Sequence, residues 1–216
     1  GDADKVYASV KNHEIYALKP TDFHGLIPKL TVKVGDSVLA GSIIFFDKYN
    51  ERIKFCSPVS GTVQDIVRGD KRRILEVIIK SNSEVKYVSH SLVNPKDFSR
   101  EKIIDHMLEK GVWPFIRQKP YDIIANPSDM PKSIFISAFK SGPLAIDNDF
   151  ALYGMDELFQ KGLDIISKLT NGKTHLNLDG NTNSSKVFSD AKGVELNSFS
   201  GPHPAGNVGI QIHHLD

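Results

Sequence analysis

The chain has 216 residues, of which 40% are hydrophobic and 25% charged, and its 27 basic and 26 acidic side chains give a formal net charge of +1. This composition is typical of a soluble globular protein with one large or two small domains. It excludes a membrane-spanning helix, which needs roughly 18 consecutive apolar residues. A single cysteine excludes an internal disulfide framework, and the near-neutral charge gives no reason to expect nucleic acid as a partner.

The first third of the chain is predicted to form short strands separated by turns. Apolar and polar residues alternate in Leu30–Val34 and in Gly61–Val67, and Ile43–Phe46 is a buried run. The pattern Val34–Val38 returns at Val67–Lys71. This favours a strand–turn–strand unit used twice in a barrel-sandwich, and two coincidental Gly-Asp turns are the alternative.

One lysine of this region is a candidate for covalent modification. Lys33–Gly41 and Ser57–Val63 resemble the lipoyl and biotinyl carrier domains, in which a lysine at a hairpin tip carries the cofactor, and Lys48 occupies the comparable place. The hairpin is longer than the carrier pattern, and Tyr49–Arg52 replaces the small residue that follows the carrier lysine. We therefore expect the fold without the carrier function. The short basic run Lys71–Arg73 is expected in a solvated turn.

The periodicity becomes helical after about residue 94. Ser99 is a suitable N-cap for a helix whose apolar stripe ends at Gly111, and residues 134–136 are predicted to form a buried strand. A second, longer helix is predicted to begin near Asp147 and to end near Leu169.

Strands at about 174–179 and 194–199 complete a β-α-β order, which is typical of a parallel sheet. The second half is therefore predicted to be a Rossmann-like α/β domain, with the boundary near residues 88–98. The last residues, Gly209–Asp216, are expected to begin a new strand, and their abrupt end suggests a piece of a longer protein.

The glycine-rich segment near the end of the chain does not fit a nucleotide triphosphatase. Gly201 and Gly206 have P-loop spacing, but Asn207 and Val208 stand where a lysine and a Ser or Thr would contact phosphate and magnesium. The α/β half also lacks the Gly-x-Gly-x-x-Gly pattern of dinucleotide sites after its first strand.

Three histidines, His203, His213 and His214, could bind zinc or transfer protons. Neighbouring residues of a strand point to opposite faces, and no Cys, Asp or Glu completes a ligand set, so no metal site is predicted. Cys56 is expected to be a small buried hydrophobic residue.

The segment Ser200–Asp216 carries the pattern Gly-Pro-His-Pro-Ala-Gly-x-x-Gly, and Val34–Asp36, Ser60–Val63 and Arg68–Arg72 add support. With these motifs the chain resembles the A-subunit family of the bacterial sodium-translocating NADH:quinone oxidoreductases (Na-NQR). The resemblance covers nearly all residues but about half of the family's usual length, so that the extreme N-terminus and the C-terminal half are missing.

The resemblance implies α/β plus all-β architecture in three segments. Residues 2–88 would form a lipoyl/biotinyl-like barrel-sandwich domain, and residues 95–200 a Rossmann-like α/β domain related to the flavin subunit of respiratory complex I. Residues 201–216 would contain the signature and the start of a truncated segment.

The resemblance also implies a function. The chain would belong to a peripheral subunit without a transmembrane helix, at the cytoplasmic face of the bacterial inner membrane. This subunit would have a quinone-associated and assembly role in a six-subunit complex. The complex would couple NADH oxidation and quinone reduction to sodium export. The whole complex would use NADH and ubiquinone or menaquinone, and the partners would be its other subunits, especially those in the membrane. A lipoyl- or biotin-type carrier or small-molecule enzyme with Lys48 modified is the alternative, and a plain interaction module is a third.

No cofactor is expected on this chain alone, and no catalytic residue is assigned. The flavin-binding relatives carry a glycine-rich loop where this chain has Gly111–Arg117, and Trp113, Phe115 and Ile116 would obstruct a flavin phosphate. The acidic motif of the relatives is replaced by Lys140–Pro143.

The residues expected to matter are those of the signature. Their expected role is a tight turn with closely packed backbone, and His203 is also a candidate contact to a ligand or partner. These residues are Gly201, His203, Gly206 and Gly209.

Overall fold

The computed structural model describes residues 4–91, 94, 97–182 and 184–215. These residues form two compact units. The β unit contains the described residues of Tyr7–Val93 and Ile104–Pro127, and the α/β unit those of Gly1–Val6, Asn94–Ile103 and Ser128–Asp216. Residues 2, 95 and 216, at which predicted segments begin or end, lie outside the described residues.

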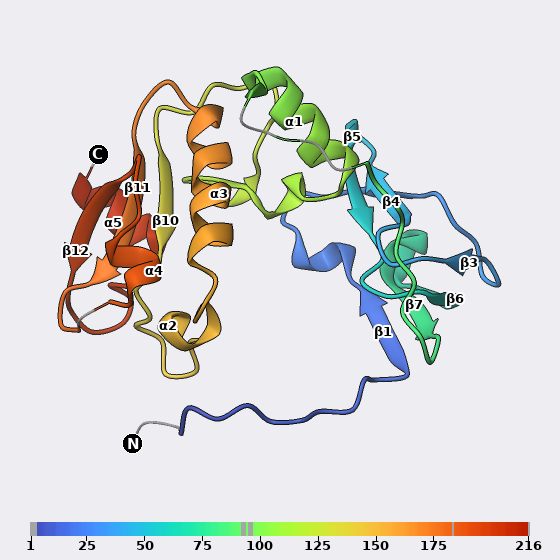
Figure 1. Ribbon diagram of the computed structural model, residues 1–216. Helices are drawn as coiled ribbons and strands as arrows, with labels where there is room; N and C mark the ends of the chain where they lie inside the picture. The colour runs from blue at the N-terminus through green and yellow to red at the C-terminus, as the bar shows by residue number, and fades with distance from the viewer. Residues whose placement is uncertain (1–3, 92–93, 95–96, 183, 216) are drawn as a thin grey trace. The chain divides into compact units, whose positions relative to one another are not determined.

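The two larger sheets of the β unit are antiparallel (Figure 1). The first has the order β1 (Ile15–Leu18), β7 (Ile74–Ser81), β6 (Gly61–Arg68) and β3 (Ser37–Val38), and the second the order β2 (Pro28–Leu30), β4 (Ile43–Asp47) and β5 (Asn50–Cys56). Short 3-10 helices η1 (Pro20–Asp22) and η2 (Asp70–Arg72) lie in its turns. Large apolar side chains of both sheets are fully buried, which gives the unit a core of its own; they are Ile44, Phe45, Val63, Val77 and Ile79.

Two predictions for this region differ from the structure. The strand expected over Leu30–Val34 ends at Leu30, because the backbone N–H of Lys33 donates to the Asp36 carboxylate at 3.0 Å and closes a local turn. The two Gly-Asp turns also differ in backbone conformation. Gly35 has a φ of 93°, whereas Gly69 is extended at −98°, so the turns are not two copies of one conformation.

The structure divides the predicted 95–200 segment between the two units. The predicted helix is confirmed as α1 (Arg100–Glu109), which begins directly after Ser99. The segment after it forms η4 (Trp113–Phe115), β8 (Arg117–Gln118) and β9 (Ile123–Ile124) in the β unit. Gly111 packs against β5 so closely that a Cβ there would lie 2.5 Å from the Cys56 sulfur, which explains why this segment groups with the sheets.

The α/β unit has a parallel sheet with the order β10 (Ile134–Ser137), β11 (Thr174–Asp179) and β12 (Glu195–Phe199), as predicted. Its helices are α2 (Asn148–Ala151), α3 (Asp156–Ile166), η5 (Ser167–Leu169), α4 (Lys186–Ser189) and α5 (Val208–Leu215). Leu176 of β11 packs with Leu163 of α3 and Phe188 of α4. The next residue, Asn177, bonds to Gln211 of α5, and since successive strand residues point to opposite faces, α5 covers the other face.

One helix prediction and one strand prediction for this unit need correction. The long helix expected from Asp147 to Leu169 is divided, because Gly154 adopts the left-handed conformation at a φ of 75° between α2 and α3. The strand expected from Gly209 is the helix α5, in which the carbonyl of Asn207 accepts the N–H groups of Ile210 and Gln211. Short apolar runs cannot be assigned by periodicity alone. Within the described residues, no helix has the length and apolarity to cross a membrane.

Candidate functional site

The signature segment lies where the strands of the parallel sheet end. Ser137 ends β10, and the loop that follows it contains Ser141. The signature follows β12 and leads into α5. In parallel sheets the carboxyl ends of the strands are the usual place for functional residues, so this edge is the candidate site.

A chain of buried amides connects the sheet to α5. Asn177 and Gln211 are both fully buried, and the Asn177 Nδ2 donates to the Gln211 Oε1 at 2.9 Å. Gln211 Nε2 in turn donates to the Ser137 hydroxyl at 3.0 Å and to the Ala205 carbonyl at 3.3 Å. On the other side, Asn197 Nδ2 donates to the Asn177 Oδ1 at 2.9 Å. Because buried polar groups are costly unless paired, this network fixes the position of α5 on the sheet.

The signature backbone is held by the two serines of β10 and its loop. The Gly206 N–H donates to the Ser141 Oγ at 2.8 Å, and the Gly206 carbonyl accepts from the Ser137 Oγ at 3.0 Å. Ser141 Oγ also lies 3.1 Å from the Nδ1 of His203, to which its hydroxyl can donate. His203 itself is exposed. The loop after β10 therefore positions an imidazole at the surface of the sheet edge.

The structure separates the signature glycines by role. A Cβ on Gly206 would lie 2.6 Å from both the Phe139 carbonyl oxygen and the Ser141 Oγ, so only glycine fits there. Gly201 has a φ of 137°, a conformation that favours glycine. Gly209, in the first turn of α5, has open space around its Cα. The close backbone packing is thus concentrated at Gly206.

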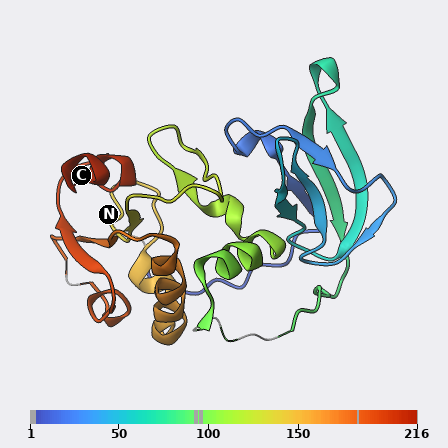
Figure 2. The same ribbon diagram turned by 90° about the horizontal axis from the view of Figure 1, so that it is seen from above.

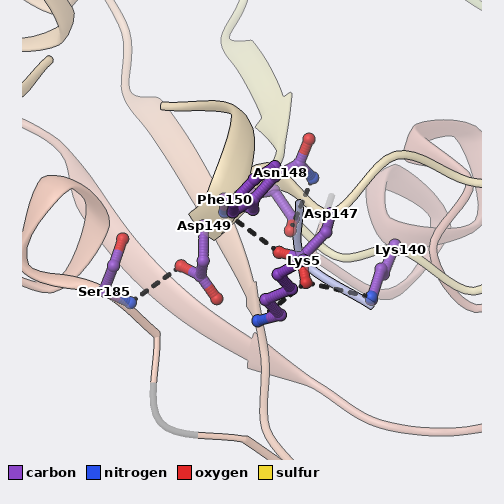
Figure 3. Close-up of polar contacts among 8 residues, drawn as sticks. Lys5, Lys140, Asp147, Asn148, Asp149, Phe150 and Ser185 are labelled. Carbon is purple, nitrogen blue, oxygen red and sulfur yellow. Dashed lines mark hydrogen bonds and ion pairs between the residues drawn. The ribbon is translucent and has the colours of Figure 1, made fainter. Parts of the chain in front are cut away.

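A second polar cluster holds the end of the loop that contains Ser141 (Figure 3). The Asp147 carboxylate accepts the Phe150 N–H at 3.1 Å as the N-cap of α2, and it pairs with the Nζ of Lys5 at 2.9 Å and of Lys140 at 3.4 Å. The hydrogen bond from Lys5, followed by the cap bond from Phe150, lowers the pKa of Asp147 from 3.8 to about 2. Asp149 accepts the Ser185 N–H at 2.8 Å and so joins α2 to the start of α4.

The segment that resembles a degenerate flavin loop does not fit a flavin phosphate. Trp113 is only 3% exposed, and its indole Nε1 donates to the Ala125 carbonyl at 2.7 Å. Backbone N–H groups on either side of Trp113 donate to backbone carbonyls and are therefore not available to a phosphate. These N–H groups belong to Gly111, Val112, Phe115 and Ile116. The residues that were expected to obstruct a flavin are therefore the ones that close this turn.

The other candidates are not among the residues that form this sheet edge. Lys48 is exposed in the two-residue turn between β4 and β5, which is a hairpin tip, as expected. Cys56 is half-buried, and burial raises the pKa of its thiol. His213 and His214 are exposed in the last turn of α5. Among the residues that the structure describes, no three His, Cys, Asp or Glu side chains are grouped so as to hold a metal.

The buried network was not predicted from the sequence. Its members that were not singled out are Ser137, Asn177, Asn197 and Gln211. The available signal was one amide within each of two segments with a predicted regular structure, Asn177 between two leucines and Gln211 between two isoleucines. An amide at a buried position needs a partner, and two such segments in one domain could have been paired on that ground.

Two of the three signature glycines, Gly206 and Gly209, give a direct test of this geometry. Gly206→Ala is expected to lower the free energy of unfolding of the α/β unit by about 2 kcal/mol, because the new Cβ overlaps the Phe139 carbonyl and the Ser141 hydroxyl. The matched control, Gly209→Ala, is expected to raise the free energy of unfolding by up to about 0.5 kcal/mol, because alanine favours the helix. Urea unfolding followed by circular dichroism measures both, and equal effects at the two positions would contradict the packing described.

The Asp147 cluster predicts a pH dependence. Because the folded pKa lies below the unfolded value, the cluster stabilises the chain above pH 3.8, and this contribution is lost as the pH falls from 3.8 to about 2. Asp147→Ala should cost about 1 kcal/mol at neutral pH, and most of this difference from the unchanged chain should be lost once the pH falls below about 2. Asp147→Asn, which keeps a cap acceptor without the charge, should show a weaker pH dependence. If the stability difference between Asp147→Ala and the unchanged chain were the same in acid as at neutral pH, the ion pairs would contribute nothing.

Two family models match the chain. Residues 1–82 match the NqrA N-terminal barrel-sandwich hybrid domain, and residues 98–216 match the NqrA second alpha/beta domain. These ranges agree with a first half made of sheets and a second half with a parallel sheet and helices.

Curated relatives give the same result. The chain is similar to the A subunit of the Na(+)-translocating NADH-quinone reductase of Saccharophagus degradans, with 36% identity over 93% of the chain and 45% of the relative. The corresponding protein of Marinomonas sp. is 33% identical over 100% of the chain and 48% of the relative. That of Alcanivorax borkumensis is 35% identical over 90% of the chain and 44% of the relative. The chain thus spans about half the length of the curated relatives it matches. Since the alpha/beta model alone matches more than half of its residues, the chain belongs to the NqrA family.

Proposed function

We propose that the chain works as part of a peripheral subunit of a sodium-translocating NADH-quinone reductase, at the cytoplasmic face of the bacterial inner membrane. The observation that carries this proposal is the match of both halves to NqrA domains, together with relatives named as the A subunit of that reductase. In this role the chain has a quinone-associated and assembly function in a complex of six subunits. The complex oxidises NADH, reduces ubiquinone or menaquinone and exports sodium.

The assembly role is supported by exposed apolar side chains in one segment of the α/β unit. Between β10 and the second turn of α3, five large apolar residues are from 44% to 98% exposed: Leu144, Ile146, Tyr153, Met155 and Leu158. Burial of apolar surface drives most protein association, and clustered exposure of this kind is typical of an interface. We assign this segment to contact with another subunit, with the membrane subunits as the first candidates.

The signature supports a recognition role for His203. The buried network and the absence of a side chain at Gly206 fix the turn, while His203 remains exposed with its Nδ1 on Ser141. A fixed turn limits the conformational freedom lost when its residues bind a partner. In our proposal Gly201, Gly206 and Gly209 shape this segment and His203 contacts the ligand or the partner.

The architecture proposed with this function is a lipoyl/biotinyl-like barrel-sandwich followed by a Rossmann-like α/β domain related to the complex I flavin subunit. The hairpin tip at Lys48 and the parallel order of β10, β11 and β12 support it. In the proposed role the chain holds no flavin, because the Gly111–Arg117 turn is closed by Trp113 and by its own backbone hydrogen bonds. Tyr49 beside Lys48 disfavours a carrier lysine.

Co-purification tests the assembly role. The chain, expressed with the other subunits of the reductase from the same source, should be recovered with them from detergent-solubilised membranes. Leu144→Asp/Tyr153→Asp should reduce this recovery at least tenfold, since two exposed apolar side chains of the contact are replaced by charges. The matched control is Met130→Asp, an exposed apolar residue of the same unit outside the segment, which should retain full recovery. Recovery of the chain without any other subunit would reject the proposal.

Equilibrium dialysis against FMN, FAD and NADH tests the absence of a flavin site. We expect no binding at micromolar ligand concentrations, because the turn offers no free amide row for a phosphate. A flavin-binding protein dialysed in parallel controls for ligand quality. Saturable micromolar binding of FMN would show that a site exists despite Trp113.

A further inference from the structure

The tip of the β6–β7 hairpin concentrates positive charge at the surface of the β unit. Four basic residues fall within six positions, and all are exposed: Arg68, Lys71, Arg72 and Arg73. Asp70 is the one acidic residue of this stretch. Within the described residues no carboxylate forms an ion pair with Lys71, Arg72 or Arg73. Figure 2 shows the tip, in teal, extending beyond the neighbouring strands of this unit.

The backbone of the tip is left-handed at two residues that carry side chains. Lys71 has a φ of 53° and Arg72 a φ of 62°, and the Arg73 N–H closes the turn on the Asp70 carbonyl at 3.1 Å. Hairpin turns with two positive φ values are normally built from Asn, Asp or Gly. Long basic side chains at these positions cost stability in the folded chain, and such strain is found preferentially where function requires it.

The turn is also held in a single shape. Gly69 donates its N–H to the Arg73 carbonyl at 2.8 Å, and the Arg68 guanidinium donates to the Arg72 carbonyl at 3.1 Å. The next side chain, Ile74, is buried, so the tip presents cations and no apolar side chain that could insert into a membrane. A protruding tip with four exposed cations fits an extended anionic surface, because several negative groups can lie around it at once.

We propose that the β6–β7 hairpin tip docks on the anionic phospholipid headgroups of the membrane. The attraction is electrostatic, and the tip does not insert into the hydrocarbon region. The choice of a membrane as the anionic surface rests on the proposed function, since translocation of sodium requires a membrane. Docking at this tip would orient the β unit at the membrane surface, independently of the apolar contact assigned to the α/β unit.

Vesicle co-sedimentation of the chain tests the proposal. The chain should bind vesicles that contain phosphatidylglycerol, bind phosphatidylcholine vesicles far more weakly, and dissociate as the ionic strength rises. Lys71→Gly/Arg72→Gly should weaken binding to the phosphatidylglycerol vesicles by about thirtyfold, the factor expected when two cations are lost near an anionic surface. Glycine adopts the left-handed conformation freely, so this variant keeps the hairpin.

The matched control removes the same net charge elsewhere. Lys161→Gln/Lys186→Gln changes two exposed lysines of α3 and α4 and should bind like the unchanged chain. Equal binding to both vesicle types, or an equal loss in the control variant, would overturn the proposal. A third result would also overturn it: the unchanged chain shows no preference for phosphatidylglycerol, and the glycine variant no longer co-purifies with the other subunits. The tip would then contact an acidic protein surface instead of a membrane. The vesicle result does not depend on co-purification, so failure of the docking proposal and failure of the proposed function remain distinguishable.

Discussion

The hydrogen bond between the buried amides of Asn177 and Gln211 is the interaction on which the candidate site depends. Each amide is excluded from water, so each is satisfied only when α5 lies over β11 in one register. That register brings the Gly206 backbone against Ser137 and Ser141, and the contact is close enough to exclude a Cβ. The exposed His203 is thus positioned through Ser141 and Gly206, which in turn depend on the fully buried Asn177 and Gln211.

The same internal pairing of polar groups is found in both units. At the carboxyl edge of the sheet the serines, asparagines and glutamine are used to bind one another. In the β unit, the turn that would approach a phosphate donates its N–H groups to its own carbonyls. Groups that are satisfied internally confer rigidity on the turns and the sheet edge to which they belong.

The sequence predicted the fold class well, because its strands and helices follow clear periodicities. β6, β11, β12 and α1 lie where alternation or the 3.6-residue repeat placed them. The errors arose where one local interaction decides the structure. The Asp36 carboxylate ends a strand, the left-handed Gly154 divides a helix, and two N–H groups that share the Asn207 carbonyl make α5 a helix. The partners in the buried network lie 34 and 74 residues apart along the chain, and no periodicity connects residues at such distances.

Trp113 has a consequence for how the molecule can be observed. It is the single tryptophan of the chain, it is almost fully buried, and it belongs to the β unit. Its fluorescence therefore responds to unfolding of that unit, while the α/β unit contributes no tryptophan signal. Circular dichroism, in contrast, responds to the helices of both units. If the two units unfold at different denaturant concentrations, the two methods will give different midpoints, and that difference measures their independence.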